Sequence, residues 1–236
     1  MSHRGSDRGF AVTSVVGFAS FASVLLFAGM TARASLVLMD FTSAEGNNSG
    51  GVYVYPYNFT INSSSITYPL MCDDFTHEIT APQSWYANAL NVGNLDSSNV
   101  THLNFPSAGV TGYLEAAYLF TEEVTAYNAS NSDPNGLYNW AVWDLLTNSD
   151  VSSAALNNSG EESQVQSYES YAESIGSSLT PSDFSNVIIY TPTDMSGSGP
   201  QEFFGYGTPI TPVPEPATVA LLGIGAAGLL RRRQKA

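Results

Sequence analysis

The distribution of charged residues constrains this chain more than any other feature. All seven lysines and arginines lie close to the two ends, and none occurs from residue 35 to residue 230. The same stretch contains all but Asp7 of the 21 aspartates and glutamates. Within it, ion pairs can form only through histidines. A body without lysine and arginine cannot neutralise phosphates, so nucleic acids are excluded as partners and P-loop nucleotide enzymes are excluded as a class.

The first 34 residues have the pattern of a secretory signal peptide. A basic start is followed by an apolar run over residues 10–30, and Ala32 and Ala34 supply the small residues of a cleavage site. We expect export through the secretion translocon and cleavage by signal peptidase, with Ser35 as the new N-terminus. An uncleaved N-terminal membrane anchor is the alternative.

Three parts in a fixed order close the chain. Pro214-Glu215-Pro216 comes first, residues 217–230 are uncharged and apolar, and Arg231, Arg232 and Arg233 lead a basic tail. A helix over the apolar part would span roughly 21 Å, short of a hydrocarbon core of roughly 30 Å, but arginine snorkelling and local thinning can close part of the gap. We therefore expect a transmembrane helix over residues 217–230, with its basic end in the cytoplasm and the body outside.

This order of a Pro-Glu-Pro motif, a short apolar span and an arginine cluster resembles the PEP-CTERM sorting signal, over residues 213–236. The resemblance implies a Gram-negative host that makes exopolysaccharide. It also implies recognition by exosortase, a membrane transpeptidase-like cysteine enzyme, and cleavage near the Pro-Glu-Pro motif. The precursor would be anchored in the inner membrane, and the mature form would lie at the cell surface, at the outer membrane or outside the cell. A plain C-terminal tail anchor is the alternative.

The region between the two ends is expected to form one extracytoplasmic domain over residues 35–190, followed by a Pro/Gly-rich linker over residues 191–212. Apolar residues make up 43% of the chain, enough for one core. Strands are expected at 52–55, 57–61, 65–72, 75–80 and 186–191, and helices at 112–127, 138–146 and 161–177. This order predicts an α+β fold, a single domain in which antiparallel strands flank a central helical segment, plus the C-terminal hydrophobic helix.

Cys72 is the only cysteine, so the mature protein cannot form an internal disulfide although it is exported. A free cysteine packs as a small apolar side chain, and a buried thiol is the simplest interpretation.

A second resemblance gives Cys72 another role. The segment Met71-Cys72-Asp73-Asp74, a helical run, and then Tyr138-Asn139-Trp140-Ala141-Val142-Trp143 resemble the layout of thioester domains in bacterial surface adhesins. Those domains join a cysteine to a glutamine in a Thr-Gln-x-Ala-Ile-Trp motif, so the resemblance implies a thioester-like pair of Cys72 and Asn139. Because asparagine is one methylene shorter than glutamine, and Tyr138 replaces the threonine, the departure favours the fold without the thioester.

The sequence contains no pattern of catalytic residues. It has no Gly-x-Ser-x-Gly nucleophile elbow, and a strand would place His77 on the face opposite Cys72. Two histidines and one cysteine in the body cannot make a zinc motif. We expect neither an enzyme nor a metal or cofactor site, beyond diffuse calcium binding by the acidic surface. The domain is expected to be a structural or binding component of the extracellular polymer, associated with exopolysaccharide. A covalent adhesin and a secreted hydrolase are the alternatives.

Overall fold

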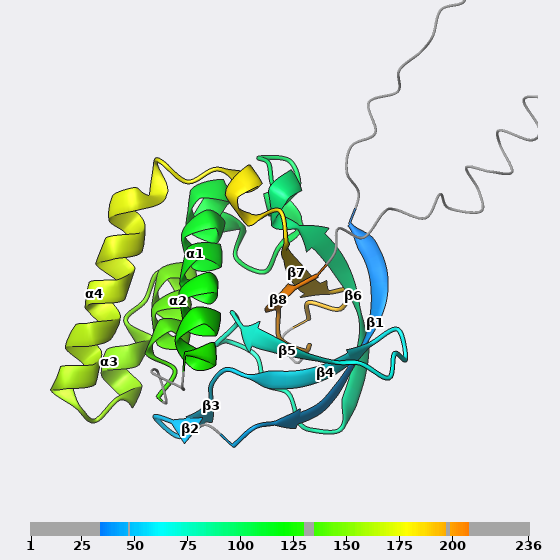
Figure 1. The fold of residues 1–236 in the computed structure, drawn as a ribbon, viewed down its shortest axis with the longest axis horizontal. Helices are drawn as coiled ribbons and strands as arrows, with labels where there is room; N and C mark the ends of the chain where they lie inside the picture. Colours follow the sequence, from blue (N-terminus) through cyan, green and yellow to red (C-terminus); the bar gives the residue numbers. More distant parts are fainter. Residues whose placement is uncertain (1–33, 47, 130–134, 197–198, 208–236) are drawn as a thin grey trace, which may run out of the picture. The chain divides into compact units, whose positions relative to one another are not determined.

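The computed structural model describes residues 34–46, 48–129, 135–196 and 199–207 (Figure 1). Its strands form a closed antiparallel barrel in the order β1-β4-β5-β8-β7-β6, and β2 and β3 form a separate two-stranded sheet. The strands are β1 (Ser35–Ala44), β2 (Asn48–Ser49), β3 (Val52–Tyr53), β4 (Tyr57–Ile61), β5 (Thr67–Cys72), β6 (Gln83–Asn91), β7 (Val187–Pro192) and β8 (Phe203–Tyr206). Closure pairs each barrel strand on both sides.

Alternating burial along β1 shows how the barrel fills its interior. Val37, Met39 and Phe41 are buried, whereas the residues between them are partly exposed. Inside the barrel, Phe59 lies edge-on to Phe203, with ring centroids 4.8 Å apart. In a barrel with so few strands the inward-pointing side chains fill the interior, so its centre is a packed core.

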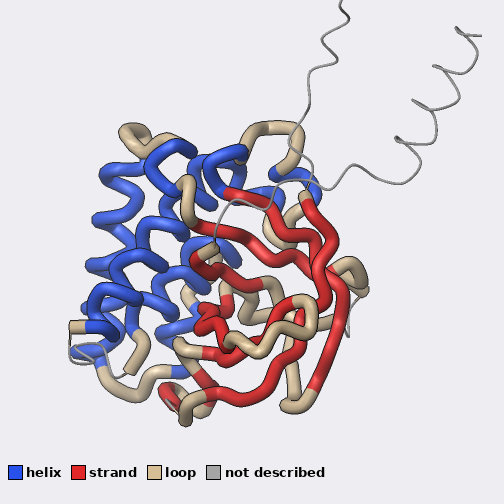
Figure 2. The backbone as a smooth tube through the Cα atoms, turned by 45° about the vertical axis from the view of Figure 1, so that its right-hand side comes forward, coloured by secondary structure: helices blue, strands red, loops and turns tan. Residues whose placement is uncertain are grey.

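The four α-helices within the described residues are all inserted between β6 and β7. They are α1 (Gly109–Asn128), α2 (Leu137–Thr147), α3 (Val151–Ala155) and α4 (Ser159–Gly176). The 3-10 turns η1 (Val92–Asn94), η2 (Val100–His102) and η3 (Pro106–Ala108) precede them, and η4 (Pro181–Phe184) follows. Figure 2 shows the helices gathered on one side of the strands. The rings of Phe120 on α1 and Phe204 on β8 stack with centroids 5.9 Å apart, which joins the helical layer to the barrel.

Local signals explain where the helices begin and end. α2 is flanked by Gly136 before its first residue and Asn148 after its last, both in the left-handed conformation that interrupts a helix. The Asn158 side chain caps α4 by accepting from the Gly160 N–H, and two glutamates in the first turn suit the positive end of the helix dipole. The three predicted helices at 112–127, 138–146 and 161–177 are confirmed.

The expected fold class is wrong. The strands do not simply flank a helical segment, because six of them close into a barrel. Two barrel strands, β1 and β6, were not expected. A third, β8, lies in the predicted linker over residues 191–212. The proline and glycine content of that segment indicated a linker, although it contains a strand of four residues. Residues 75–80, expected as a strand, form turns and irregular chain.

Several predicted segments fall outside the described residues. They are residues 1–33 of the signal peptide, including Ala32, and the whole sorting signal over residues 213–236, with its apolar helix and basic tail. Ala34 is exposed and directly precedes Ser35, the first residue of β1. Among the helices that the structure describes, none combines the length and the apolar character needed to cross a bilayer.

Candidate functional site

The candidate site lies where β5 ends beside the start of β8. Cys72, the last residue of β5, pairs with Phe203, the first residue of β8. The pairing continues beyond the ladder, because the Asp73 N–H donates to the Glu202 carbonyl oxygen at 3.2 Å. Side chains alternate between the two faces of paired strands. Cys72 and Gln201 therefore become diagonal neighbours on one face, while Asp73 and Glu202 lie opposite each other on the other face.

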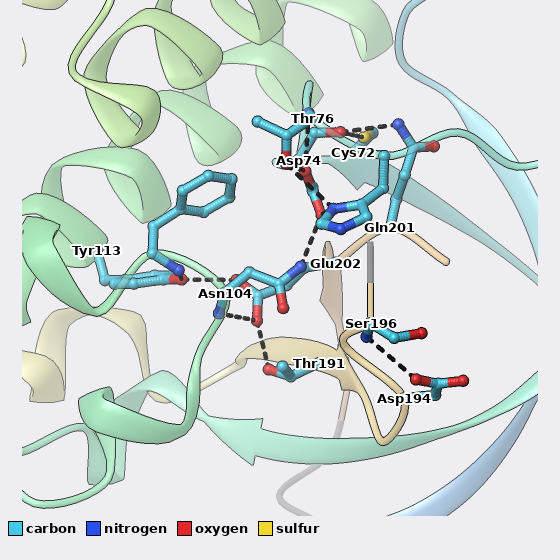
Figure 3. A network of polar contacts seen from close by, with 12 residues as sticks. Cys72, Asp74, Thr76, Asn104, Tyr113, Thr191, Asp194, Ser196, Gln201 and Glu202 are labelled. Atoms are coloured by element: carbon cyan, nitrogen blue, oxygen red, sulfur yellow. Dashed lines mark hydrogen bonds and ion pairs between the residues drawn. The ribbon is translucent and has the colours of Figure 1, made fainter. Parts of the chain in front are cut away.

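The thiol of Cys72 and the side-chain amide of Gln201 converge on one oxygen atom. The Cys72 Sγ–H donates to the carbonyl oxygen of Asp74 at 3.2 Å, and Gln201 Nε2 donates to the same oxygen at 2.7 Å (Figure 3). Cys72 is fully buried and Gln201 is 8% exposed. Long side chains bridge the distance between diagonal neighbours, so this register brings a glutamine amide to the thiol.

Burial keeps the Cys72 thiol protonated. It raises the pKa of the thiol well above its usual value, and the neighbouring acidic groups, Asp74 first, act in the same direction. A protonated, enclosed thiol is protected from oxidation and from exchange with other thiols.

Asn139 contacts Cys72 through the backbone and not through the sulfur. From α2, its Nδ2 donates to the Cys72 carbonyl oxygen at 2.7 Å, and its Oδ1 accepts from the Tyr55 N–H at 3.1 Å. The structure thus brings the predicted pair together, but it uses both ends of the Asn139 amide to connect α2 to two segments of the barrel region.

The Asp74 side chain organises the loop after β5. It accepts from Thr76 Oγ1 at 2.7 Å and from Asn104 Nδ2 at 2.6 Å, and it lies 2.7 Å from Nδ1 of His77. His77 was expected on the opposite face of a strand from Cys72. That expectation is wrong, because the chain leaves the strand after Cys72 and turns His77 back toward Asp74.

Asp73 and Glu202 form a buried carboxyl pair. Glu202 accepts from the hydroxyl of Tyr113 at 2.7 Å, from the Asn104 N–H at 3.2 Å and from the hydroxyl of Thr191. In the described part of the chain, neither oxygen of Asp73 has a hydrogen-bond donor, and the β5–β8 register places this carboxyl opposite that of Glu202. A bond between two carboxyl groups requires a proton on one of them.

The surroundings decide which of the two carries the proton. Burial raises the pKa of Asp73 well above its usual range, and the charges of Glu202 and Asp74 raise it further. Burial also raises the pKa of Glu202, but hydrogen bonds from Thr191 and Tyr113 act against this. These surroundings favour the proton on Asp73 and the negative charge on Glu202.

Sequence reasoning missed Gln201 and Glu202, because both lie in the segment interpreted as a linker. The available signal was the order Gln201-Glu202-Phe203-Phe204, two polar residues directly before an aromatic pair. Within the described ranges, no three histidine, cysteine or acidic side chains cluster as metal ligands would.

Comparisons with known proteins bear on the C-terminus. Residues 212–234 match the family model of the PEP-CTERM protein-sorting motif. No curated protein and no solved structure matches the chain. The motif implies processing by exosortase and sorting to the cell envelope or surface. This chain is therefore an exported protein that carries a PEP-CTERM sorting motif at its C-terminus.

Proposed function

We propose that the mature domain is a non-catalytic attachment module at the cell surface, and that Cys72 and Gln201 form an internal thioester through which it bonds to the extracellular polymer. The observation that carries this proposal is the convergence of the Cys72 thiol and the Gln201 amide on the Asp74 carbonyl oxygen. The exopolysaccharide matrix, with the proteins and amino sugars embedded in it, is the proposed partner.

The bond-forming step balances without an oxidant or cofactor. The sulfur of Cys72 adds to the side-chain carbonyl carbon of Gln201, the carbon–nitrogen bond breaks, and the thiol proton leaves with the nitrogen as ammonia. A primary amine of the partner later attacks the same carbonyl carbon. The sulfur–carbon bond then breaks, an amide to the partner forms, and a proton returns the sulfur to a thiol.

Because burial keeps the Cys72 thiol protonated, the sulfur has to release its proton as it adds to the carbonyl carbon. Burial supports the chemistry in two other ways. It brings the thiol and the amide together before any reaction, which lowers the entropic cost of bond formation. It also excludes water, which would otherwise hydrolyse a thioester.

Gln201 suits the role of acyl donor better than Asn139. Both ends of the Asn139 amide bond to buried backbone groups, so releasing it would cost two hydrogen bonds. Gln201 has the longer side chain and lies diagonal to Cys72 across the β5–β8 pairing.

Amine incorporation tests the proposal. The full-length chain, exported and purified, is incubated with a fluorescent primary amine and mapped by peptide mass spectrometry. We expect stoichiometric labelling at Gln201 together with one newly exposed thiol at Cys72. Cys72→Ala and Gln201→Glu should abolish labelling, whereas Gln83→Glu is a matched control that should not.

Folded wild-type protein that takes up no amine would refute the covalent part. The domain would then remain a proposed non-covalent structural component of the matrix. Labelling at Asn139 would restore the pair that the sequence resemblance implies.

A further inference from the structure

The β5–β8 pairing that aligns Cys72 with Gln201 is short. The ladder joins Met71 to Phe204 and Cys72 to Phe203, and one backbone bond from Asp73 to Glu202 extends it. The side chains of Asp73 and Glu202 are fully buried and lie opposite each other at its open end. Whatever keeps these two side chains together therefore also keeps Cys72 beside Gln201.

Two ionised carboxylates could not remain in this position. Directly opposed like charges destabilise a strand pair, and burial strengthens the repulsion. Elsewhere in proteins a lysine or arginine commonly offsets such charges, but this chain has none from residue 35 to residue 230. Of the histidines in that stretch, His77 contacts Asp74 and His102 is exposed.

The other groups around the pair also lack a positive charge. Asp74 and Cys72 lie on the same segment as Asp73, Tyr113 approaches Glu202 from α1, and Thr191 approaches it from β7. The Asn104 N–H comes from the segment between η2 and η3. These neighbours are acids or neutral donors, so a proton is the counter-charge that remains available.

We propose that Asp73 and Glu202 share one proton and act as the positioning residues that align Cys72 with Gln201 for thioester formation. The functional half of this inference rests on the proposed thioester. Protonated Asp73 donates to Glu202 and closes the end of the β5–β8 pairing. Ionisation of Asp73 places two negative charges opposite each other, separates the strand ends and moves Gln201 away from the thiol.

The first test measures thioester formation against pH. The full-length chain is refolded from denaturant over a series from mildly acidic to alkaline pH and quenched in acid, and the loss of one ammonia is read by intact mass. The wild-type yield should fall at alkaline pH. Asp73→Asn retains a donor to Glu202 but cannot ionise, so its yield should persist to higher pH. Glu78→Gln, which alters an exposed acid of the same segment, should follow the wild type.

A second measurement works without the thioester. In a Cys72→Ala background, urea unfolding is followed over the same pH series. The pKa of Asp73 is raised in the folded state, so its proton stabilises the fold at low pH and this contribution is lost as pH rises. Adding Asp73→Asn should remove that part of the pH dependence.

The two measurements separate the possible failures. Absence of ammonia loss in every protein, with the predicted change in the unfolding profiles, would refute the thioester and support the shared proton. The inference would be overturned if Asp73→Asn and its parent showed the same pH dependence both in the yield of ammonia loss and in stability to urea.

Discussion

Replacing Asn139 with alanine tests how α2 is joined to the barrel. In the structure, the Asn139 side chain satisfies two buried backbone groups, the Cys72 carbonyl oxygen at 2.7 Å and the Tyr55 N–H at 3.1 Å. Asn139 itself is fully buried, so alanine removes the hydrogen bond that each of these enclosed groups makes to it.

The expected loss of stability follows from those two groups. Each buried polar group without a partner costs about 1–3 kcal/mol, so Asn139→Ala should lower the free energy of unfolding by about 2–6 kcal/mol. That is a large fraction of the total stability of a typical domain, about 5–15 kcal/mol.

Urea unfolding of the full-length protein, followed by tryptophan fluorescence, measures this loss. The midpoint should fall while the dependence on urea stays the same. Asn157→Ala, at an exposed position, is the matched control and should change stability by less than about 0.5 kcal/mol. A loss below about 1 kcal/mol for Asn139→Ala would refute the assigned contacts. The molecules that remain folded should still lose ammonia, because Gln201 and not Asn139 supplies the acyl group.

Three further predictions concern other parts of the chain. Gly136→Ala should destabilise the domain by about 2–5 kcal/mol in thermal unfolding, because Gly136 has a φ of +59° and an added Cβ would lie 2.4 Å from Cβ of Val54. Burial and nearby acids raise the pKa of Glu169 from 4.5 to about 7, so stability should fall as pH rises through this range, and Glu169→Gln should flatten the fall in urea titrations. Replacing Pro214-Glu215-Pro216 with alanines should block exosortase processing, so that intact mass shows an uncut C-terminus; normal trimming would contradict the assignment.

The helices and some of the strands follow directly from local sequence. Apolar spacing predicts α1, α2 and α4, and β-branched and aromatic runs predict β4, β5 and β7. In these segments, local preference and tertiary environment agree, so a single window of sequence contains the necessary information.

Barrel closure depends on information that no window contains. β1 pairs with both β4 and β6, and β8 completes the ring from a segment rich in proline and glycine. Phe203 and Phe204 look like isolated aromatics in a linker, yet both are fully buried. Their environment comes from segments distant in sequence, because Phe59 lies against Phe203 and Phe120 against Phe204.

The candidate site was predictable only in part. Cys72 is conspicuous as the single cysteine of the chain, and the resemblance to thioester domains directed attention to Asn139 on α2. Gln201 becomes visible only when the register of β5 against β8 is known, because a diagonal neighbour across two strands leaves no local pattern. The same holds for the carboxyl pair formed by Asp73 and Glu202.

The intact mass of the mature protein, purified from its native host, tests the central claim most directly. A thioester between Cys72 and Gln201 makes the mass lower by one ammonia than that of the processed sequence, and a cross-linked peptide should join the two residues. The deficit should disappear in Cys72→Ala and in Gln201→Glu. A full mass, with a free thiol at Cys72 and an intact amide at Gln201 in folded protein, would contradict the proposed thioester.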